Sequence, residues 1–399
     1  MAFLYVGPRG VAWRKHSYSS GNIFDRSPHL YYLQKVMGWK QRDNKGSFAF
    51  GKALEEAIQH HHENNGEGAV EAFTSRWDVH KDNKEMTYTK TEKDWASLRR
   101  VGIEMIKLYI IRQPSLPIPI GAQTIFQREY SKELLPGDAN YGEIEFAGKL
   151  DIISYVDPTH PLLPKLQWKP EYGPLRPLIV DIKTSAVDFP EMYGMAAYDL
   201  QLRAYSFLTG IRDVSLLWFV KKGHSLQKGS SVTLLEDAGQ FKAGQELVVA
   251  QMDETDAILV ANDFMIEEME KAQGKKPDGK TDQTKAAKER RDVWLLQFGV
   301  KVPTEIITKQ RLQYNAGFVT IESANDAGKI AMRQVINIVQ SWKSNNWENK
   351  LGVRYPHDDK ADPYFRAFIL GDEAYRNQNF IKSDEDTLDD LFAETPEDE

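Results

Sequence analysis

The chain has 399 residues, 41% hydrophobic and 27% charged, a composition that excludes a wholly disordered or collagen-like protein. It has no cysteine, which excludes disulfides, thiolate metal sites and a cysteine nucleophile. The net charge of −7 comes largely from Ser383 to Glu399, which hold nine acids and no base. All 51 bases and the other 49 of the 58 acids lie before this tail, so the acidity does not exclude a polyanionic partner.

The sequence shows no membrane or export signal. Its apolar runs are far shorter than the roughly 20 residues that cross a bilayer. The N-terminal residues MAFLYVGPRG lack the basic stretch and apolar core of a signal peptide. We therefore expect a cytoplasmic protein with no membrane partner.

The N-terminal part of the chain shows helical periodicity. A helix is expected from His29 to about Gly38. Apolar residues at spacings of three and four predict a second helix over 47–63, with Ser47 as its N-cap, and a third over 94–111. Prolines follow the third helix and end it.

Strand patterns dominate the next hundred residues or so. Alternating or continuous apolar residues predict strands, and one helix closed by glycine interrupts them. The expected strands are 124–130, 144–155, 178–184 and 214–220, and the helix is 195–209. We interpret residues 1–230 as one α/β core with an N-terminal helical segment.

Beyond residue 230 the pattern becomes helical. Helices are predicted at 251–273, 284–298 and 325–343. We therefore expect residues 231–382 to form a mainly helical extension that packs on the core. Residues 383–399 are expected to be a disordered acidic tail.

A basic segment lies between the first two of these helices. Residues 275–291 carry seven bases and three acids. One interpretation is a solvated surface loop, and the other is a loop that contacts phosphates. In the second interpretation the candidate DNA-binding residues are Lys275, Lys276, Arg290 and Arg291.

The chemistry centres on the strand at 178–184. Asp181 and Lys183 are two residues apart, so their side chains share one face of the strand. A carboxylate and an ammonium on a largely apolar strand are costly unless they are paired or bind something. Asp151 follows Gly148 on the preceding strand, and the two aspartates converge if these strands pair. Two carboxylates with open positions suit Mg²⁺ or Mn²⁺.

The helix after this strand adds two polar side chains. Gln201 and Tyr205 are four residues apart and therefore lie on one helix face. Their groups can hydrogen-bond a phosphate or fix the orientation of Lys183.

The order of these segments resembles the PD-(D/E)XK nuclease superfamily, in its RecB-type branch. That pattern is a helix with G-x-x-x-(H/E), then G-x-x-D, then (D/E)-x-K on a strand, then Q-x-x-x-Y on a helix. The corresponding segments here are Gly51-Lys52-Ala53-Leu54-Glu55, Gly148-Lys149-Leu150-Asp151, Asp181-Ile182-Lys183 and Gln201-Leu202-Arg203-Ala204-Tyr205. The resemblance covers about residues 20–225. It implies a restriction-endonuclease-like core, with a mixed central sheet flanked by helices and additional C-terminal helices.

The resemblance also implies a role for each matched residue. Asp151 and Asp181 would bind a divalent metal, Mg²⁺ or Mn²⁺, together with the backbone carbonyl of Ile182. Lys183 would orient or deprotonate the attacking water. Gln201 and Tyr205 would contact the DNA backbone or support the site.

Two further acidic positions follow from the same resemblance. Many relatives carry a glutamate on the strand before G-x-x-D, and Glu129 fits that position. Glu55 stands where many relatives have histidine and is a further metal ligand candidate. The helical pattern does not choose between Glu55 and Glu56, while the spacing to Gly51 favours Glu55.

Several relatives carry an iron–sulfur cluster, and here Ser27 stands where the first cysteine would be. A chain without cysteine cannot ligate that cluster, so packing is expected to join the N- and C-terminal segments. The candidates near the C-terminus are Tyr355-Pro356 and Tyr364-Phe365.

The sequence therefore predicts a Mg²⁺-dependent deoxyribonuclease acting in recombination, repair or phage DNA processing in a bacterial or phage-infected cell. An exonuclease is favoured. The alternatives are a structure-specific endonuclease on the same core and a non-catalytic DNA-binding or assembly protein.

The expected partner is DNA, and a ring-shaped homo-oligomer is allowed by family analogy. The tail segment Thr387-Leu388-Asp389-Asp390-Leu391-Phe392 resembles short peptides that bind replication or recombination partners, and the alternative is a solubilising or DNA-mimicking tail.

Overall fold

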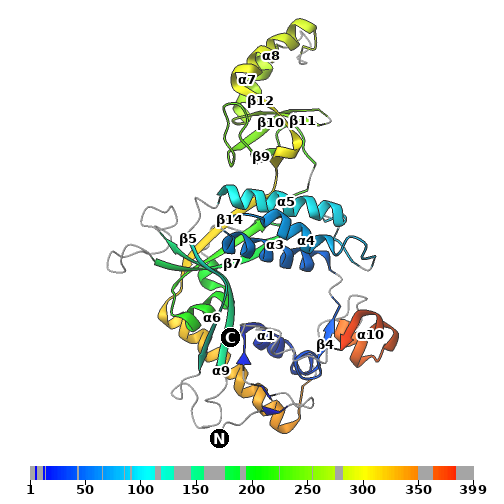
Figure 1. Ribbon diagram of the computed structural model, residues 1–399, viewed down its shortest axis with the longest axis vertical. Coiled ribbons are helices and arrows are strands. Elements are labelled where there is room, and N and C mark those ends of the chain that lie inside the picture. The colour runs from blue at the N-terminus through cyan, green and yellow to red at the C-terminus, as the bar shows by residue number, and fades with distance from the viewer. Residues whose placement is uncertain are drawn as a thin grey trace.

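The computed structural model describes residues 5–6, 12–13, 15–42, 45–64, 66–84, 86–89, 92–112, 118–129, 145–156, 176–188, 195–223, 225–253, 255–274, 282–348 and 363–382. They form a mixed α/β protein, in which a smaller lobe stands on a larger body (Figure 1). Within these ranges, no helix is both long and apolar enough to cross a membrane.

A six-stranded mixed sheet lies at the centre of the body. Its order is β14-β8-β7-β6-β3, with β5 also paired to β6. β7 runs parallel to β8 and β3 parallel to β6, whereas the other pairs are antiparallel. The strands are β3 (Lys15–His16), β5 (Ile118–Glu129), β6 (Glu145–Val156), β7 (Arg176–Ser185), β8 (Asp213–Val220) and β14 (Arg311–Phe318).

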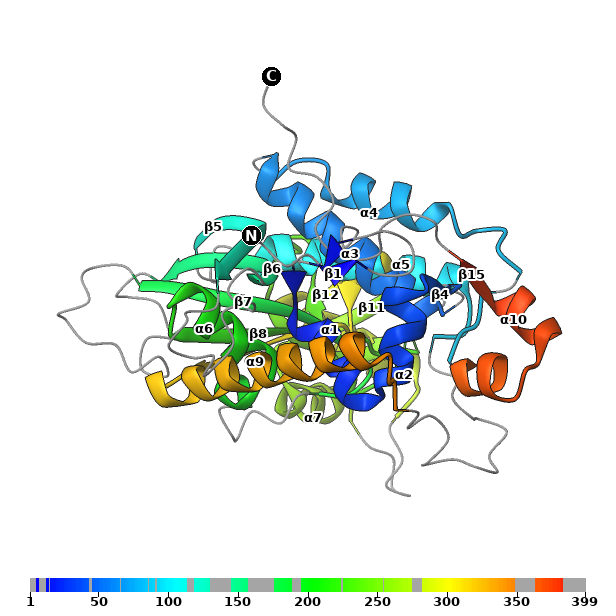
Figure 2. The same cartoon turned by 90° about the horizontal axis from the view of Figure 1, so that it is seen from below.

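Helices cover both faces of this sheet (Figure 2). One face packs on α3 (Gly46–Glu63), α4 (Ala69–Asp78) and α5 (Trp95–Arg112), and the other on α1 (Tyr18–Arg26), α6 (Leu200–Thr209) and α9 (Ile321–Ser344). Alternation along β7 explains this arrangement. Val180 and Ile182 belong to the cluster beneath α3 and α5, whereas Ile179 belongs to the cluster beneath α6. A strand buried on both faces reads as a continuous apolar run.

Most elements predicted for the core are confirmed. The predicted helices over 47–63 and 94–111 correspond to α3 and α5, and the three later strands to β6, β7 and β8. The predicted N-cap Ser47 is wrong, because α3 begins at Gly46 and Ser47 lies inside it. The predicted strand over 124–130 is the end of the longer β5. The structure also adds α4, which the sequence interpretation omitted.

Two predicted helices are divided in the structure. The first becomes α2 (Pro28–Tyr31) and η1 (Tyr32–Val36), and the second becomes η8 (Met195–Tyr198) followed by α6. Asp199 causes the second division. Its backbone is extended and its side chain accepts a hydrogen bond from the Leu202 amide, as an N-cap does.

The prediction that residues 231–382 are mainly helical is wrong for the first half of that range. A five-stranded antiparallel sheet forms the smaller lobe, with the order β12-β11-β10-β9-β13, and α7 and α8 accompany it. These elements are β9 (Ser231–Leu234), β10 (Glu246–Met252), β11 (Asp256–Val260), α7 (Asp263–Gln273), α8 (Lys285–Phe298), β12 (Gly299–Pro303), η9 (Thr304–Ile306) and β13 (Ile307–Thr308). The short apolar runs of β10 and β11 fit a strand or a buried helix, so periodicity alone misassigned them.

The chain then returns to the body. β14 pairs antiparallel with β8 along the whole of both strands, from Arg311 opposite Val220 to Phe318 opposite Asp213. The smaller lobe is therefore an insertion between two neighbouring strands of the central sheet, rather than a C-terminal extension.

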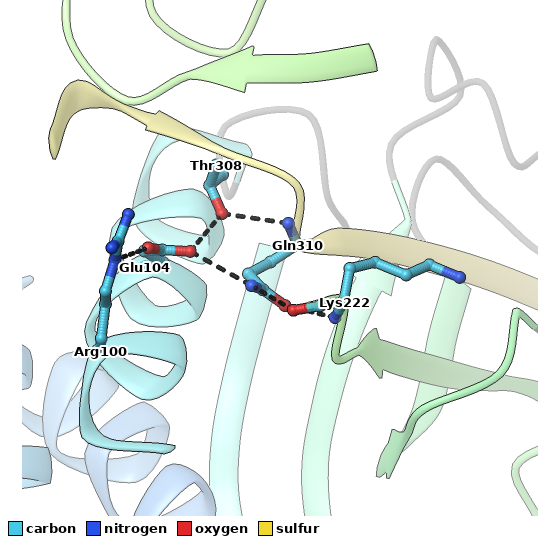
Figure 3. A network of polar contacts seen from close by, with 5 residues as sticks. All are labelled: Arg100, Glu104, Lys222, Thr308 and Gln310. Atoms are coloured by element: carbon cyan, nitrogen blue, oxygen red, sulfur yellow. Dashed lines mark hydrogen bonds and ion pairs between the residues drawn. The ribbon is translucent and has the colours of Figure 1, made fainter. Parts of the chain in front are cut away.

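A buried polar network joins the lobe to the body (Figure 3). Glu104 on α5 is 6% exposed and accepts hydrogen bonds from Thr308 Oγ1 at 2.7 Å and from Gln310 Nε2 at 3.2 Å. Arg100 Nε donates to the same carboxylate at 2.8 Å. Gln310 also accepts from the Lys222 amide at 2.7 Å. Both connections between body and lobe, through Lys222 and through Gln310, are thus fixed to each other and to α5.

Packing joins the N- and C-terminal segments, as the sequence predicts. Leu30 and Leu33 form one apolar cluster with Tyr364, Ala367 and Phe380. The Tyr364 hydroxyl also donates to the Trp39 carbonyl at 3.2 Å.

A small sheet adds to this contact: β4 (Trp39–Gln41) pairs with β15 (Phe380–Lys382), which follows η10 (Phe365–Ile369) and α10 (Glu373–Asn379). At the N-terminus, β1 (Tyr5–Val6) pairs with β2 (Ala12–Trp13). Tyr355-Pro356 and the tail at 383–399 lie outside the described residues.

Candidate active site

Asp181 and Lys183 form an ion pair on β7. Lys183 Nζ lies 2.6 Å from Asp181 Oδ2. The aspartate is 1% exposed, whereas the lysine side chain is 34% exposed. Because residues two apart on a strand share a face, both side chains project towards α6. The pair therefore places a buried carboxylate beneath an accessible ammonium group.

Asp151 approaches this pair from β6. Its Oδ2 accepts a hydrogen bond of 2.7 Å from the Ile182 amide, between the two members of the pair. The ladder between β6 and β7 ends at Ile152 opposite Val180, so the side chain replaces the next backbone partner. In an extended strand the amide and carbonyl of one residue point to the same side. The Ile182 carbonyl therefore also faces the gap beside Asp151.

Burial and neighbouring charges shift the ionisation of this pair. Loss of water, followed by the negative charge of Asp151, raises the pKa of Asp181 to about 7 against the lowering effect of Lys183. Burial lowers the pKa of Lys183, but the charges of Asp181, Asp151 and Asp199 outweigh it, so the pKa lies above its ordinary value. Lys183 is therefore a cation and a hydrogen-bond donor at neutral pH.

A side chain of α6, Gln201, holds the lysine in place. Lys183 Nζ donates to Gln201 Oε1 at 3.1 Å, and Gln201 Nε2 donates to the Tyr205 hydroxyl at 2.8 Å. Burial raises the pKa of Tyr205, so this phenol stays neutral. The sequence analysis expected Gln201 and Tyr205 to share one helix face and to fix Lys183; Gln201 contacts the lysine directly, and Tyr205 acts through Gln201.

Gly148 explains how α6 comes so close to β6. A β-carbon built on Gly148 would lie 2.9 Å from Tyr205 Cε1 and 3.0 Å from Leu208 Cδ2. Only glycine leaves room for the Tyr205 ring against the strand that carries Asp151.

Asp199 and Tyr18 are neighbours of the site that the sequence analysis missed. The charge of Asp199 acts on Asp181 and Lys183 and raises the pKa of both. Tyr18, on α1, has a pKa raised by burial, and the charges of Asp199, Lys183 and Asp181 also reach it. An aspartate two residues before Gln201 is a recognisable N-cap signal, whereas nothing in the sequence places Tyr18 here.

The first motif lies beside the same end of β7. A β-carbon on Gly51 would lie 3.8 Å from Thr184 Oγ1, so the first half of α3 passes next to the residue after Lys183. Glu55, one turn further on, is half-buried. Glu56 pairs instead with Arg76 on α4, with Arg76 Nε 3.1 Å from Glu56 Oε2, and is 49% exposed. This pairing turns Glu56 away and favours Glu55 as the residue that faces the sheet.

The other predicted site residues lie elsewhere. The backbone of Glu129 ends β5 opposite Glu145, several residues along β6 from Asp151. Lys275 and Lys276 fall outside the described residues. Arg290, on α8, donates to the carbonyl of Gln273 at the end of α7 at 2.9 Å, and Arg291 pairs with Asp292 at 2.7 Å. Both arginines belong to the smaller lobe.

The donor set fits a hard divalent cation. Across the described parts of the chain, no three His, Cys, Asp or Glu side chains gather as a complete metal-ligand set. Mg²⁺ binds to proteins through one or two carboxylates and otherwise keeps water or takes phosphate oxygens, and Mn²⁺ takes similar ligands. Asp151, the buried Asp181 carboxylate and the Ile182 carbonyl offer such a partial oxygen set.

Comparisons with known proteins assign no family to this chain. No family model matches the sequence, and no curated protein matches it. Among solved structures, the chain is similar to one described as "Crystal structure of SSO0001", with 11% identity and a TM-score of 0.17. That match covers 50% of this chain and 71% of the other. A TM-score this low carries no argument about fold or function.

Proposed function

We propose that this protein is a Mg²⁺-dependent DNA nuclease with a restriction-endonuclease-like core, acting as an exonuclease. The observation that carries the proposal is the chain of contacts from Asp151 through Ile182 to Asp181, Lys183 and Gln201. Three motifs that are far apart in the sequence meet there in the order typical of PD-(D/E)XK nucleases.

Asp151, Asp181 and the Ile182 carbonyl would hold the metal. When bound, Mg²⁺ lowers the pKa of a coordinated water and neutralises charge on the phosphate. Lys183, held by Gln201, stays protonated and donates a hydrogen bond, so it orients the water or a phosphate oxygen. Gln201 and Tyr205 keep the lysine in place.

Lys183→Ala tests the proposal directly. End-labelled linear duplex and closed circular duplex are incubated with Mg²⁺ or with EDTA, and cleavage is measured over time. Wild type is expected to degrade linear DNA only with Mg²⁺, and Lys183→Ala to lose at least about a hundredfold in rate, typical of removing one positioned catalytic group.

The matched control is Lys107→Ala. Lys107 is 39% exposed and pairs with Glu236 at 3.6 Å, on the opposite side of the sheet. It is expected to cut like wild type. Cleavage of closed circles would favour the endonuclease alternative, and DNA binding without cleavage by wild type would favour the non-catalytic alternative.

A further inference from the structure

Apolar side chains flank the site: Val187 follows β7, Met195, Tyr198 and Leu200 precede Gln201, and Trp218 lies opposite Lys183 in the sheet. We name this group the apolar rim: Val187, Met195, Tyr198, Leu200 and Trp218. Val187 and Tyr198 are each 70% exposed, Leu200 is 46% and Met195 is 40% exposed. Exposed apolar side chains on the segments that border a polar centre offer a surface for an apolar part of a ligand.

Sheet register places Trp218 next to the lysine. Lys183 on β7 lies opposite Trp218 on the parallel strand β8, so the two side chains share one face. The half-buried indole donates its Nε1–H to the Val187 carbonyl at 3.2 Å, which fixes the segment that follows β7.

Tyr198 comes from the segment between β7 and α6. It ends η8, which lies against β8, and it directly precedes Asp199, whose charge reaches Asp181 and Lys183. The guanidinium of Arg203 lies 5.3 Å from the Tyr198 ring centroid and donates to the Ala197 carbonyl at 2.9 Å. An aromatic ring is therefore presented to solvent with a fixed positive charge beside it.

We infer that this site takes single-stranded DNA, with unpaired bases stacking on Tyr198 and the rest of the apolar rim. Stacking on aromatic side chains beside a positive charge is how proteins hold single strands without reading their sequence. In an intact duplex the base faces are covered by their neighbours and do not reach such a surface. The inference rests on the proposed function, because Trp218 lies opposite Lys183 and Tyr198 directly precedes Asp199, whose charge reaches the same pair.

The test is a binding measurement in EDTA, where the metal-dependent reaction is switched off. Fluorescence anisotropy follows a labelled DNA strand of about 12 nucleotides, within the usual site size, and a blunt duplex of the same sequence. The variants are Tyr198→Ala, Tyr198→Phe and Phe264→Ala. Phe264 is the matched control, since it is 61% exposed and has Lys271 Nζ 5.8 Å from its ring, but it lies on α7 in the smaller lobe.

We expect wild type to bind the single strand more tightly than the duplex. Tyr198→Ala is expected to weaken single-strand binding about tenfold, and Tyr198→Phe to retain it, because stacking needs the ring and not the hydroxyl. Phe264→Ala is expected to bind as wild type does.

Three results would overturn the inference: unchanged binding by Tyr198→Ala, an equal loss in Phe264→Ala, or equal wild-type affinity for duplex and single strand. Tighter binding of the matching RNA strand would overturn the assignment to DNA. If single-strand binding depends on Tyr198 but wild type cuts no DNA with Mg²⁺, the inference about the ligand stands and the proposed nuclease function falls.

Discussion

Asp181 is held in a state that costs the metal-free protein stability. Its carboxylate is buried, and Asp151 adds a second negative charge nearby, while Lys183 compensates only in part. This excess of negative charge agrees with the proposed cation site, because a bound cation would offset the repulsion between the two carboxylates.

The stability effect has a definite sign. The pKa of Asp181 is raised from 3.8 to about 7 in the folded protein, so the folded state binds a proton more readily between these pH values. The free energy of unfolding is therefore lowered as pH rises through this range, and the full cost is present above about pH 7.

Asp181→Asn removes this cost. We expect the free energy of unfolding in EDTA at pH 8 to rise by about 1–3 kcal/mol, less than the pKa shift alone implies because Lys183 loses its charged partner. Urea denaturation of wild type and variant measures this difference in unfolding free energy. Mg²⁺ should raise the stability of wild type but not of the variant.

The control for this comparison is Asp253→Asn, because Asp253 is 51% exposed and pairs only loosely with Lys301, at 3.8 Å. In EDTA its stability should stay within about 0.5 kcal/mol of wild type, and Mg²⁺ should raise it as in wild type, because the candidate metal site is intact. A variant of Asp181 that is less stable than wild type in EDTA would contradict the cation-receiving interpretation.

At the scale of elements, the site depends on how closely α6 approaches β6. α6 carries Gln201 and Tyr205, and β6 carries Asp151, so their separation sets the distance between Lys183 and its partners. Gly148 sets that separation, since Tyr205 and Leu208 occupy the space where a side chain would stand.

Gly148→Ala should therefore disturb stability and site together. The added methyl group must push Tyr205 or Leu208 away, at a cost of about 1–3 kcal/mol. We expect a lower denaturation midpoint and a cleavage rate reduced about tenfold or more, as Gln201 moves from Lys183.

Gly223→Ala is the matched substitution, because no heavy atom lies within 4 Å of its added β-carbon. It is expected to leave both quantities unchanged. A Gly148→Ala protein with wild-type stability would show that α6 adapts without loss.

At the scale of the whole molecule, an inserted lobe contacts α5 through one buried carboxylate, Glu104, and through exposed ion pairs such as Lys107 with Glu236. Glu104 satisfies two side chains of the returning connection, Thr308 and Gln310, and is paired with Arg100. Buried polar groups that lose a shared partner are left unsatisfied, which makes such a network sensitive to single substitutions.

Glu104→Ala should loosen the lobe from the body. We expect a loss of about 2–3 kcal/mol in unfolding free energy, since Thr308 and Gln310 lose their acceptor. Amide hydrogen exchange should rise most around residues 222 and 307–311, where the two connections meet.

Glu236→Ala is the control, because Glu236 is 57% exposed. The unfolding free energy of this variant should differ from that of wild type by no more than about 0.5 kcal/mol. Uniform exchange across the chain would contradict a role confined to the junction.

The sequence by itself determined the local parts of the site. Strand alternation puts Asp181 and Lys183 on one face of β7, and helical spacing puts Gln201 and Tyr205 on one face of α6. Both patterns are fixed by backbone geometry. The helices and strands that carry them were predictable for the same reason. The functional interpretation came from the order of these motifs.

Only the tertiary structure decided what is not local. Pairing of β6 with β7 brought Asp151 to the Ile182 amide, and packing of α1 and α6 added Tyr18 and Asp199 to the site. Contact with α4 separated Glu56 from Glu55. The return of β14 to the central sheet made residues 221–310 an insertion. Each depends on contacts between distant segments, and short apolar runs such as β10 and β11 do not specify their partners.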